Sequence, residues 1–514
     1  MSVALQVGIV VGYLLVALAV GVAAYRVTER TAEDYYLASR TFGTVVLLFT
    51  VFATLLSAFT FFGGPNIAYA FGPEWILVMG LMDGVLFAVL WYAVGYKQWL
   101  LGRRHGYVTL GEMLGDRFGS PALRALVAVV SLFWLFPYVM LQQVGAGGAL
   151  SALTDGAVPF WAGATLITGF MIVYVVLAGV RGIAWTDTLQ GAFMLVTVWV
   201  AALWVLVAVD GGLATINAGL RAGDASHFFA LGSEWYTPQR MLTFAVSIAF
   251  GVAMFPQVNQ RFFTADSEAV LKRSFVLWPV LVVVLFVPAF LLGAWARGLG
   301  VAADIGAGEN VLPPLLEAYT PPWFAALVIA GALAAMMSSS DSMLLSGSSY
   351  FTRDVYRPLV DDDISDRRED LLGRAGVAVF AAAALLASLR FGRSPGAVGE
   401  VLVNLGDVAF GGFAQLTLPV VLALYWSRTT RDAMFAGILV PTLVYLPFRL
   451  EIVGPYVVEV PGAGEVALLA PAYLGWGVSL YCILLGLLVT VGVSLVTSPA
   501  AAEDHSKYFG TRAD

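Results

Sequence analysis

The chain has 514 residues, of which 60% are hydrophobic and only 12% are charged, and its formal net charge is −7. Because an ordinary soluble domain carries roughly 25% charged residues, this composition indicates a polytopic membrane protein. The single cysteine, Cys482, excludes a disulfide framework and a thiolate metal site. Only three histidines occur, all expected outside the membrane, which argues against a haem or a histidine-ligated metal centre.

Hydropathy over a helix-length window predicts about thirteen membrane-spanning segments. The first apolar run has no basic region before it and is long enough to span, so we do not interpret it as a cleavable signal peptide. The loops are mostly short, and we predict one transmembrane domain over residues 1–514. The predicted segments are 4–25, 43–71, 75–100, 122–152, 158–180, 185–209, 239–263, 274–297, 321–352, 372–391, 397–426, 432–449 and 470–497.

The distribution of basic residues orients these segments. An odd number of spans places the two termini on opposite sides of the membrane, and alternate assignment of the loops puts 21 of the 27 Lys and Arg on one side. Cytoplasmic loops carry an excess of Lys and Arg. We therefore predict a cell-membrane protein with the N-terminus outside and the C-terminus in the cytoplasm. The basic residues assigned to the outer side are Arg221, Arg240, Arg297, Arg390, Arg393 and Arg449.

The second segment carries a helix interruption and a set of hydroxyls. A Gly-Gly-Pro sequence at residues 63–65 lies where a spanning helix should still be running, and we predict the break there. Thr54, Ser57 and Thr60 have three-residue spacing, so their hydroxyls are expected along one helix face. A break at membrane depth is tolerated only where it is buried in protein or lines a cavity, as in a transport site. A kinked packing helix with small residues at its interface is the alternative.

The seventh segment is also interrupted, with Gly251 and Pro256 inside its apolar run. Each interrupted segment begins a five-helix block, 43–209 and 239–426, and an odd number of helices inverts one block relative to the other. Interruptions at matching places in inverted halves indicate a binding site at the membrane midplane. We predict an all-α fold with an inverted five-plus-five-helix core, broken first and sixth core helices, and peripheral helices 4–25, 432–449 and 470–497.

The ninth segment contains four serines within five positions: Ser338, Ser339, Ser340 and Ser342, with Asp341 among them. Clustered hydroxyls and unwound carbonyls offer Na⁺, a hard cation, several oxygen ligands without fixed charge. The alternative is that each serine bonds back to its own helix and allows close packing.

Several segments together resemble the sodium:solute symporter family, whose members carry proline, pantothenate, sugars, short carboxylates or iodide. The resemblance covers nearly the whole chain in order. The segments that carry it, besides the broken second span, are YVVLAGVRGIAWTDTLQG (174–191), FPQVNQRFFTADS (255–267), SSSDSMLLSGSSYFTRDVY (338–356) and LVNLGDVAFGGFAQLTLPVVLALYW (402–426).

The resemblance implies alternating access driven by the inward sodium gradient. It also implies one Na⁺ between the broken first core helix and the eighth core helix, with no other cofactor. Carried over to this sequence, its ligands are the main-chain carbonyls of Ala53, Leu56 and Ala335 and the hydroxyls of Ser338 and Ser339.

One departure from the family bears on the substrate. Some members place an acidic residue in the broken helix, where this chain has Thr54, Leu55 and Leu56. That departure argues against a proline-type carrier and leaves the ion stoichiometry open. The sequence ATLLSAFTFFGGP at residues 53–65 resembles pantothenate and monocarboxylate carriers more closely.

The solute is expected beside the sodium, against the broken helices and the third core helix. That third helix carries buried amides, which are costly at mid-membrane unless they are hydrogen-bonded; a cavity role and a helix–helix bond are both open. Phe255 and Gln257, which follow the break in the seventh segment, are two further candidates for contact with the solute. The predicted substrate-binding residues are Thr54, Ser57, Thr60, Gln142, Phe255 and Gln257.

Ionisable residues at membrane depth are few, and each is a functional candidate. We interpret Asp83 and Asp407 as structural, each paired with a buried amide or an arginine. We predict an ion pair between Arg181 and Asp187 at the cytoplasmic ends of their helices.

No intramembrane histidine, metal-spaced His/Cys set or phosphate-binding loop is present, so we predict no enzyme and no catalytic residues. Broken inverted helices favour a carrier over a channel, and the short tail after Thr497 disfavours a sensor with a signalling domain. The expected function is Na⁺-coupled symport of a small organic solute, with proton coupling as the alternative. The expected partners are the solute, sodium and the lipid bilayer, with no nucleic acid; no oligomeric state is indicated.

Overall fold

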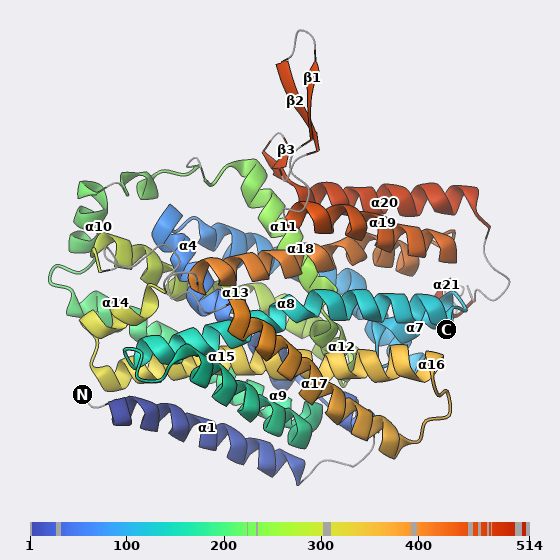
Figure 1. The fold of residues 1–514 in the computed structure, drawn as a ribbon, viewed down its shortest axis with the longest axis horizontal. Helices are drawn as coiled ribbons and strands as arrows, with labels where there is room; N and C mark the ends of the chain where they lie inside the picture. The colour runs from blue at the N-terminus through green and yellow to red at the C-terminus, as the bar shows by residue number, and fades with distance from the viewer. Residues whose placement is uncertain are drawn as a thin grey trace.

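The computed structural model describes residues 3–26, 32–223, 225–232, 235–301, 310–391, 398–450, 456–460, 464–469, 472–473, 475–498 and 506–509. Within these ranges the chain is almost entirely helical (Figure 1). Eleven helices are long and apolar enough to cross a membrane, and the number rises to thirteen when two bent helix pairs are each counted as one span. The thirteen predicted segments are therefore confirmed in number and order.

The long helices are α1 (Val3–Tyr25), α8 (Pro121–Leu153), α9 (Phe160–Ala208), α13 (Glu268–Gly298), α15 (Pro322–Ser349), α17 (Asp366–Phe391), α18 (Val398–Tyr425), α19 (Arg431–Arg449) and α20 (Val478–Val496). Two spans lie within α9, Phe160–Leu177 and Gly179–Ala208, because the backbone at Gly179 is not helical. The third span combines η3 (Leu77–Met82), α5 (Asp83–Leu90), η4 (Trp91–Gly95) and α6 (Tyr96–His105). The shorter elements are α2 (Ala32–Leu37), η1 (Ala38–Arg40), α7 (Leu110–Arg117), α10 (Leu213–Ala222), η5 (Ser226–Phe229), α14 (Leu312–Tyr319), η6 (Tyr350–Tyr356), α16 (Arg357–Leu359) and α21 (Ser506–Phe509).

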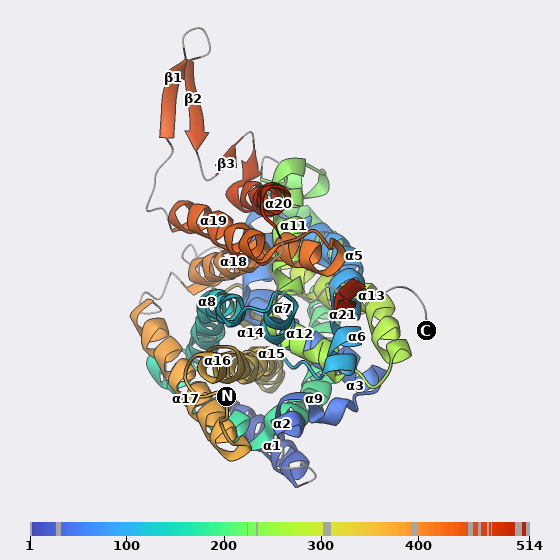
Figure 2. The ribbon, with the colours of Figure 1, turned by 90° about the vertical axis from the view of Figure 1, so that its right-hand side faces the viewer.

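The helices run roughly along one axis of the molecule, and the start of α1 and the short α21 lie at opposite ends of it (Figure 1). Seen from one end, α8 and α15 are central, α1 and α9 lie on one side, and α19 and α20 lie on the other (Figure 2). Almost every side chain of α15 is buried, because it packs against α3, α8, α9, α12 and α17. Its run of Gly, Ala and Ser allows this close approach.

Two spans are broken. The first consists of α3 (Thr44–Leu55), η2 (Phe59–Gly63) and α4 (Gly64–Phe71), with a bend of 64°. The second consists of α11 (Pro238–Ala253) and α12 (Pro256–Thr264), with a bend of 54° just before Pro256.

The predicted position of the first break is wrong. Leu56 has extended backbone angles (φ −78°, ψ 124°), whereas Gly63 and Gly64 are helical. The glycines serve packing instead: a Cβ on Gly64 would lie 1.8 Å from Cε1 of Phe290 on α13. The break therefore falls near Ser57, about two turns earlier than predicted.

The last predicted segment begins too early. Residues 470–477 were assigned to it, but α20 starts at Val478. Before it, β3 (Ala472–Tyr473) pairs with β4 (Trp476–Gly477), and Gly475 in their turn has φ +84°, which a helix cannot include. A longer antiparallel hairpin of β1 (Tyr456–Val460) and β2 (Gly464–Leu469) projects away from the helices (Figure 1).

Candidate functional site

The first break lies directly against the serine-rich part of α15. Ser338 Oγ donates hydrogen bonds to the carbonyl of Ala53 at 2.8 Å and to that of Ala335 at 3.0 Å. Ser339 Oγ donates to the carbonyl of Leu56 at 2.5 Å. All five residues predicted as sodium ligands therefore meet at one place in the membrane core, and each is buried.

A further oxygen joins this group. Ser339 Oγ also donates to the carbonyl of Thr54 at 2.8 Å, a residue that sequence reasoning selected only for its hydroxyl. Because the last four carbonyls of a helix lack partners within it, an earlier placement of the break would have identified Thr54. The oxygens at this junction are all neutral carbonyls or hydroxyls, a donor set that suits a hard monovalent cation. Among the described residues, no group of three or more His, Cys, Asp or Glu could hold a metal.

Only part of the serine cluster reaches across to the broken helix. Ser346, Ser348 and Ser349 bond to carbonyls of α15 itself, as the packing alternative expects. The Ser340 hydroxyl is buried and has no partner in the described chain. Ser338 and Ser339 are thus distinguished by geometry from neighbours of the same type.

Gln142 on α8 supports the broken backbone directly. Its Oε1 accepts the N–H of Ala58 at 2.9 Å, and its Nε2 donates to the carbonyl of Tyr138 at 3.3 Å. The Tyr138 hydroxyl in turn donates to Ser57 Oγ at 3.2 Å. Of the two interpretations left open for Gln142, the structure shows the helix–helix bond.

The three hydroxyls of the broken span do not form one row. Thr54 Oγ1 hydrogen-bonds Ser342 Oγ at 2.8 Å on α15, whereas Ser57 faces α8. Thr60 Oγ1 accepts the N–H of Ser57 at 3.4 Å and so caps the new helical start. The expectation of a common face is wrong because the break lies between Thr54 and Ser57.

Aromatic rings gather at the second break, where one hydroxyl, that of Thr417, donates to the carbonyl of Phe250 at 2.7 Å. Phe255 stacks on Phe410 with ring centroids 5.8 Å apart, and its centroid lies 5.2 Å from that of Tyr138. Phe413 lies 4.8 Å from Phe255, and Phe59 of the first broken span meets Phe410 edge-on at 5.9 Å. We call these five residues the central aromatic cluster. Sequence reasoning missed Phe410 and Phe413.

Gln257 is the second residue of α12 and is fully buried. Neither its side-chain nitrogen nor its oxygen has a hydrogen-bond partner among the described residues. An unpaired amide in a buried place costs free energy. Gln257 is therefore the predicted substrate residue that retains free hydrogen-bonding capacity, in contrast to Gln142.

A buried ion pair lies beside the serine cluster. Arg261 on α12 pairs with Asp187 on α9 at 3.4 Å, and Thr50 Oγ1 donates to the same carboxylate at 2.5 Å. Arg261 also hydrogen-bonds Ser342. The predicted pair of Arg181 with Asp187 is wrong, because Arg181 pairs instead with Asp34 of α2 at 2.5 Å.

The two carboxylates interpreted as structural, Asp83 and Asp407, differ. Asp407 pairs with Arg449 at 2.8 Å, as the expected pairing with an arginine requires. Both oxygens of Asp83 are buried without a partner in the described chain, so the pairing expected for Asp83 is not found.

A model of the sodium:solute symporter family matches residues 35–440. The chain belongs to the sodium:solute symporter family. The sodium/pantothenate symporter of Escherichia coli (strain K12) is 30% identical over 445 residues, which cover 85% of this chain and 88% of the relative. The sodium/proline symporter of Haemophilus influenzae is 28% identical over 467 residues, 85% of this chain and 86% of the relative.

A solved structure of a Na⁺-coupled sialic acid symporter, in a substrate-bound outward-open state, resembles this one with a TM-score of 0.78. Its sequence is 21% identical, and the match covers 97% of this chain and 99% of that chain. This likeness shows the fold, which is the predicted inverted-repeat core with two broken helices. As a member of this family, the protein is a multi-pass membrane transporter and not an enzyme.

Proposed function

We propose that the protein takes up a small carboxylate-bearing organic solute together with Na⁺ by alternating access. The observation that carries this proposal is the junction of Ser338 and Ser339 with the carbonyls of Ala53, Thr54 and Leu56. A cation at this junction ties α15 to the broken span, so its binding stabilises one arrangement of the two halves over another.

The solute position in this proposal is the space between the two breaks. The central aromatic cluster closes it on one side, and Gln257 supplies an amide without a partner among the described residues. The buried pair of Arg261 and Asp187 lies next to the serine cluster and holds α12 to α9. Opening the solute position toward the side of this ion pair requires Arg261 and Asp187 to separate. The intact pair therefore keeps that side of the carrier closed in the alternating cycle.

The class of solute follows from two observations. The broken span has Thr54, Leu55 and Leu56 in place of the acidic residue of some family members. The curated relative at 30% identity is a sodium/pantothenate symporter. We therefore place pantothenate first among the candidates, followed by short monocarboxylates and amino-acid-like solutes. We propose inward transport with the N-terminus outside and the C-terminus in the cytoplasm, since alternate assignment of the loops puts 21 of 27 basic residues on the side of the C-terminus.

The test is solute uptake into proteoliposomes that contain the purified protein, with and without an inward Na⁺ gradient. The panel contains pantothenate, pyruvate, acetate, proline, a sugar, sialic acid and iodide. We expect uptake of one carboxylate that collapses when choline replaces Na⁺. Uptake that ignores Na⁺ but follows a pH gradient would favour the proton-coupled alternative and refute the sodium assignment.

A further inference from the structure

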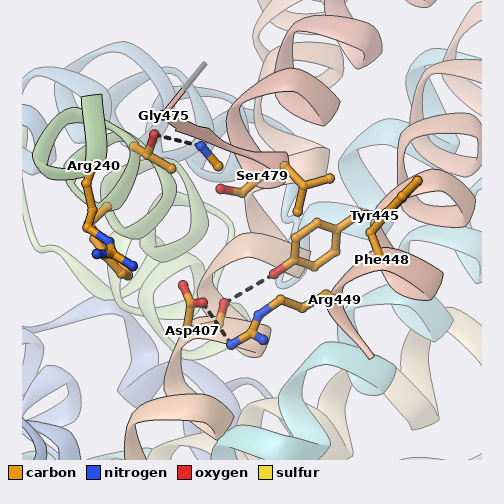
Figure 3. A pocket seen from close by; sticks show the side chains of 11 residues that line it. Arg240, Asp407, Tyr445, Phe448, Arg449, Gly475 and Ser479 are labelled. Carbon is orange, nitrogen blue, oxygen red and sulfur yellow. Dashed lines mark hydrogen bonds and ion pairs between the residues drawn. The ribbon is translucent and has the colours of Figure 1, made fainter. Parts of the chain in front are cut away.

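A polar cavity lies away from the junction of Ser338 and Ser339 with the first broken span. It has a volume of about 280 Å³ and lies between α11, α18, α19 and the start of α20. Arg240 approaches it from α11 and Arg449 from α19, with Asp407 of α18 between them (Figure 3). At roughly 30 Å³ per water, this volume equals about nine waters and approaches the ~300 Å³ of the smallest ligand pockets. It has room for a small organic ion.

The charges of the pocket do not balance. Asp407 neutralises Arg449 through their 2.8 Å contact, yet the Nε of Arg449 is buried and has no partner in the described chain. The guanidinium of Arg240 lies over the ring of Trp235 at 4.8 Å, and no described carboxylate pairs with it. The three ionised groups leave one positive charge in excess. Two of the six basic residues assigned to the outer side therefore meet in this one pocket.

The pocket borders the central aromatic cluster. Its wall residue Phe244 meets Trp75 edge-on at 5.2 Å, and Trp75 lies 6.4 Å from Phe59 of the cluster. Asp407 lies one helical turn before Phe410, another member of the cluster. The rings of Phe244 and Trp75 therefore lie between the pocket and Phe59 of the first broken span.

We propose that this pocket binds the carboxylate of a small organic anion without sodium, on the outer approach to the central aromatic cluster. Arg240 supplies the uncompensated charge, and the Nε of Arg449 supplies a second donor. A guanidinium matches a carboxylate in both charge and geometry. The proposal relies on the proposed function only for the choice of probe, because the pocket's charge is a property of the described residues.

The experiment measures binding of pantothenate, and of acetate as the smallest carboxylate, by calorimetry in neutral phosphatidylcholine nanodiscs. The buffer contains choline and no Na⁺, so that sodium-dependent binding between the breaks does not contribute. We expect R240Q to weaken binding about tenfold, since a hydrogen bond to a charged group is lost. The matched control is R297Q: Arg297 also lies over an aromatic ring, that of Tyr69 at 5.3 Å, but does not line the pocket.

A variant of opposite sign tests the charge argument. D407N removes the negative charge of the pocket, so we expect pantothenate to bind more tightly than in the wild-type protein. Panthenol, the uncharged alcohol analogue, should bind at least tenfold more weakly than pantothenate. The proposal is overturned if R240Q binds both carboxylates like the wild type, if neither probe binds, or if D407N weakens binding as much as R240Q does.

Two further measurements distinguish carboxylate binding from lipid binding and from loss of folding. In nanodiscs with phosphatidylglycerol, loss of carboxylate binding together with Arg240-dependent lipid retention would identify an anionic headgroup as the ligand and overturn the proposal. Size-exclusion profiles and thermal unfolding of each variant confirm that it is folded. Sodium-driven uptake is measured separately: Arg240-dependent binding without any uptake would refute the proposed function and leave this pocket assignment intact.

Discussion

The two broken helices occupy matching places in inverted halves, but their breaks are satisfied in different ways. At the α3–α4 break, Ser338, Ser339 and Gln142 take up the freed backbone groups. At the α11–α12 break, Phe255 packs among rings and Gln257 has no hydrogen-bond partner among the described residues. One break is a closed polar junction and the other is an apolar wall with a spare amide. This comparison supports our proposal that the ion binds at the first break, between α3 and α15, and that the solute is recognised at the second break.

The largest expected effect is on sodium dependence at the first break. In the double variant S338A/S339A, both hydroxyls that donate to carbonyls of the broken span are lost. We expect the half-saturating Na⁺ concentration for uptake to rise about tenfold or more, because each lost oxygen ligand is worth a charge-assisted contact. S340A is the matched control, since its hydroxyl touches no described partner. Unchanged sodium dependence in the double variant would show that Na⁺ does not bind at this junction.

The next effect concerns stability at the same break. Q142L leaves the N–H of Ala58 buried without its acceptor. We expect the free energy of unfolding to fall by about 1–3 kcal/mol, measured as a lower midpoint of thermal unfolding in detergent. A midpoint equal to that of the wild type would show that Gln142 does not hold the break.

Gly63 and Gly64 test where the break lies. A Cβ on Gly64 would meet Phe290 at 1.8 Å, whereas on Gly63 the nearest atom, of Phe59, lies at 3.1 Å. We expect G64A to lower stability by about 1–3 kcal/mol through overpacking, and G63A to change it by less. Both variants should retain the bend and sodium-driven uptake when folded. Loss of uptake in a stable G63A protein would instead support the original prediction that the helix break needed for transport lies at the glycines.

The smallest effect, and one of opposite sign to Q142L, is expected at the second break. Q257L removes a buried amide without a described partner, so we expect stability to rise by about 1 kcal/mol. The same change should raise the half-saturating solute concentration while leaving that for Na⁺ unchanged. A destabilised Q257L protein, or one with normal solute affinity, would contradict the assignment of solute recognition to the second break.

Much of this architecture follows from sequence periodicity and charge. The thirteen spans and the second break before Pro256 were predictable, because apolar length and a proline act locally on the helix. The first break was misplaced because Gly-Gly-Pro is a strong local signal, whereas Leu56 and Ser57 carry no such signal. The interruption there depends on hydrogen bonds from α8 and α15, more than 80 residues away in sequence.

The candidate site shows the same limit. Ser338 and Ser339 could be selected from their cluster and from the family resemblance. The sequence around the adjacent Ser340 is the same, so residue type and position alone do not distinguish the three serines. Only the direction of each side chain separates them. Asp187 was assigned the wrong partner because Arg181 is close in sequence, whereas Arg261 reaches it from the other half of the chain.

The hydroxyls of Ser338 and Ser339 have one more consequence. Each hydroxyl shares its single proton between two carbonyls, and in the proposed sodium site a cation would bind the same carbonyls through its own charge after the hydroxyls rotate. The junction therefore has two self-consistent bonding patterns of similar shape. If the proposed sodium site is correct, the carbonyls keep hydrogen-bond partners after the cation leaves. The empty carrier would then return without buried backbone groups that lack a partner.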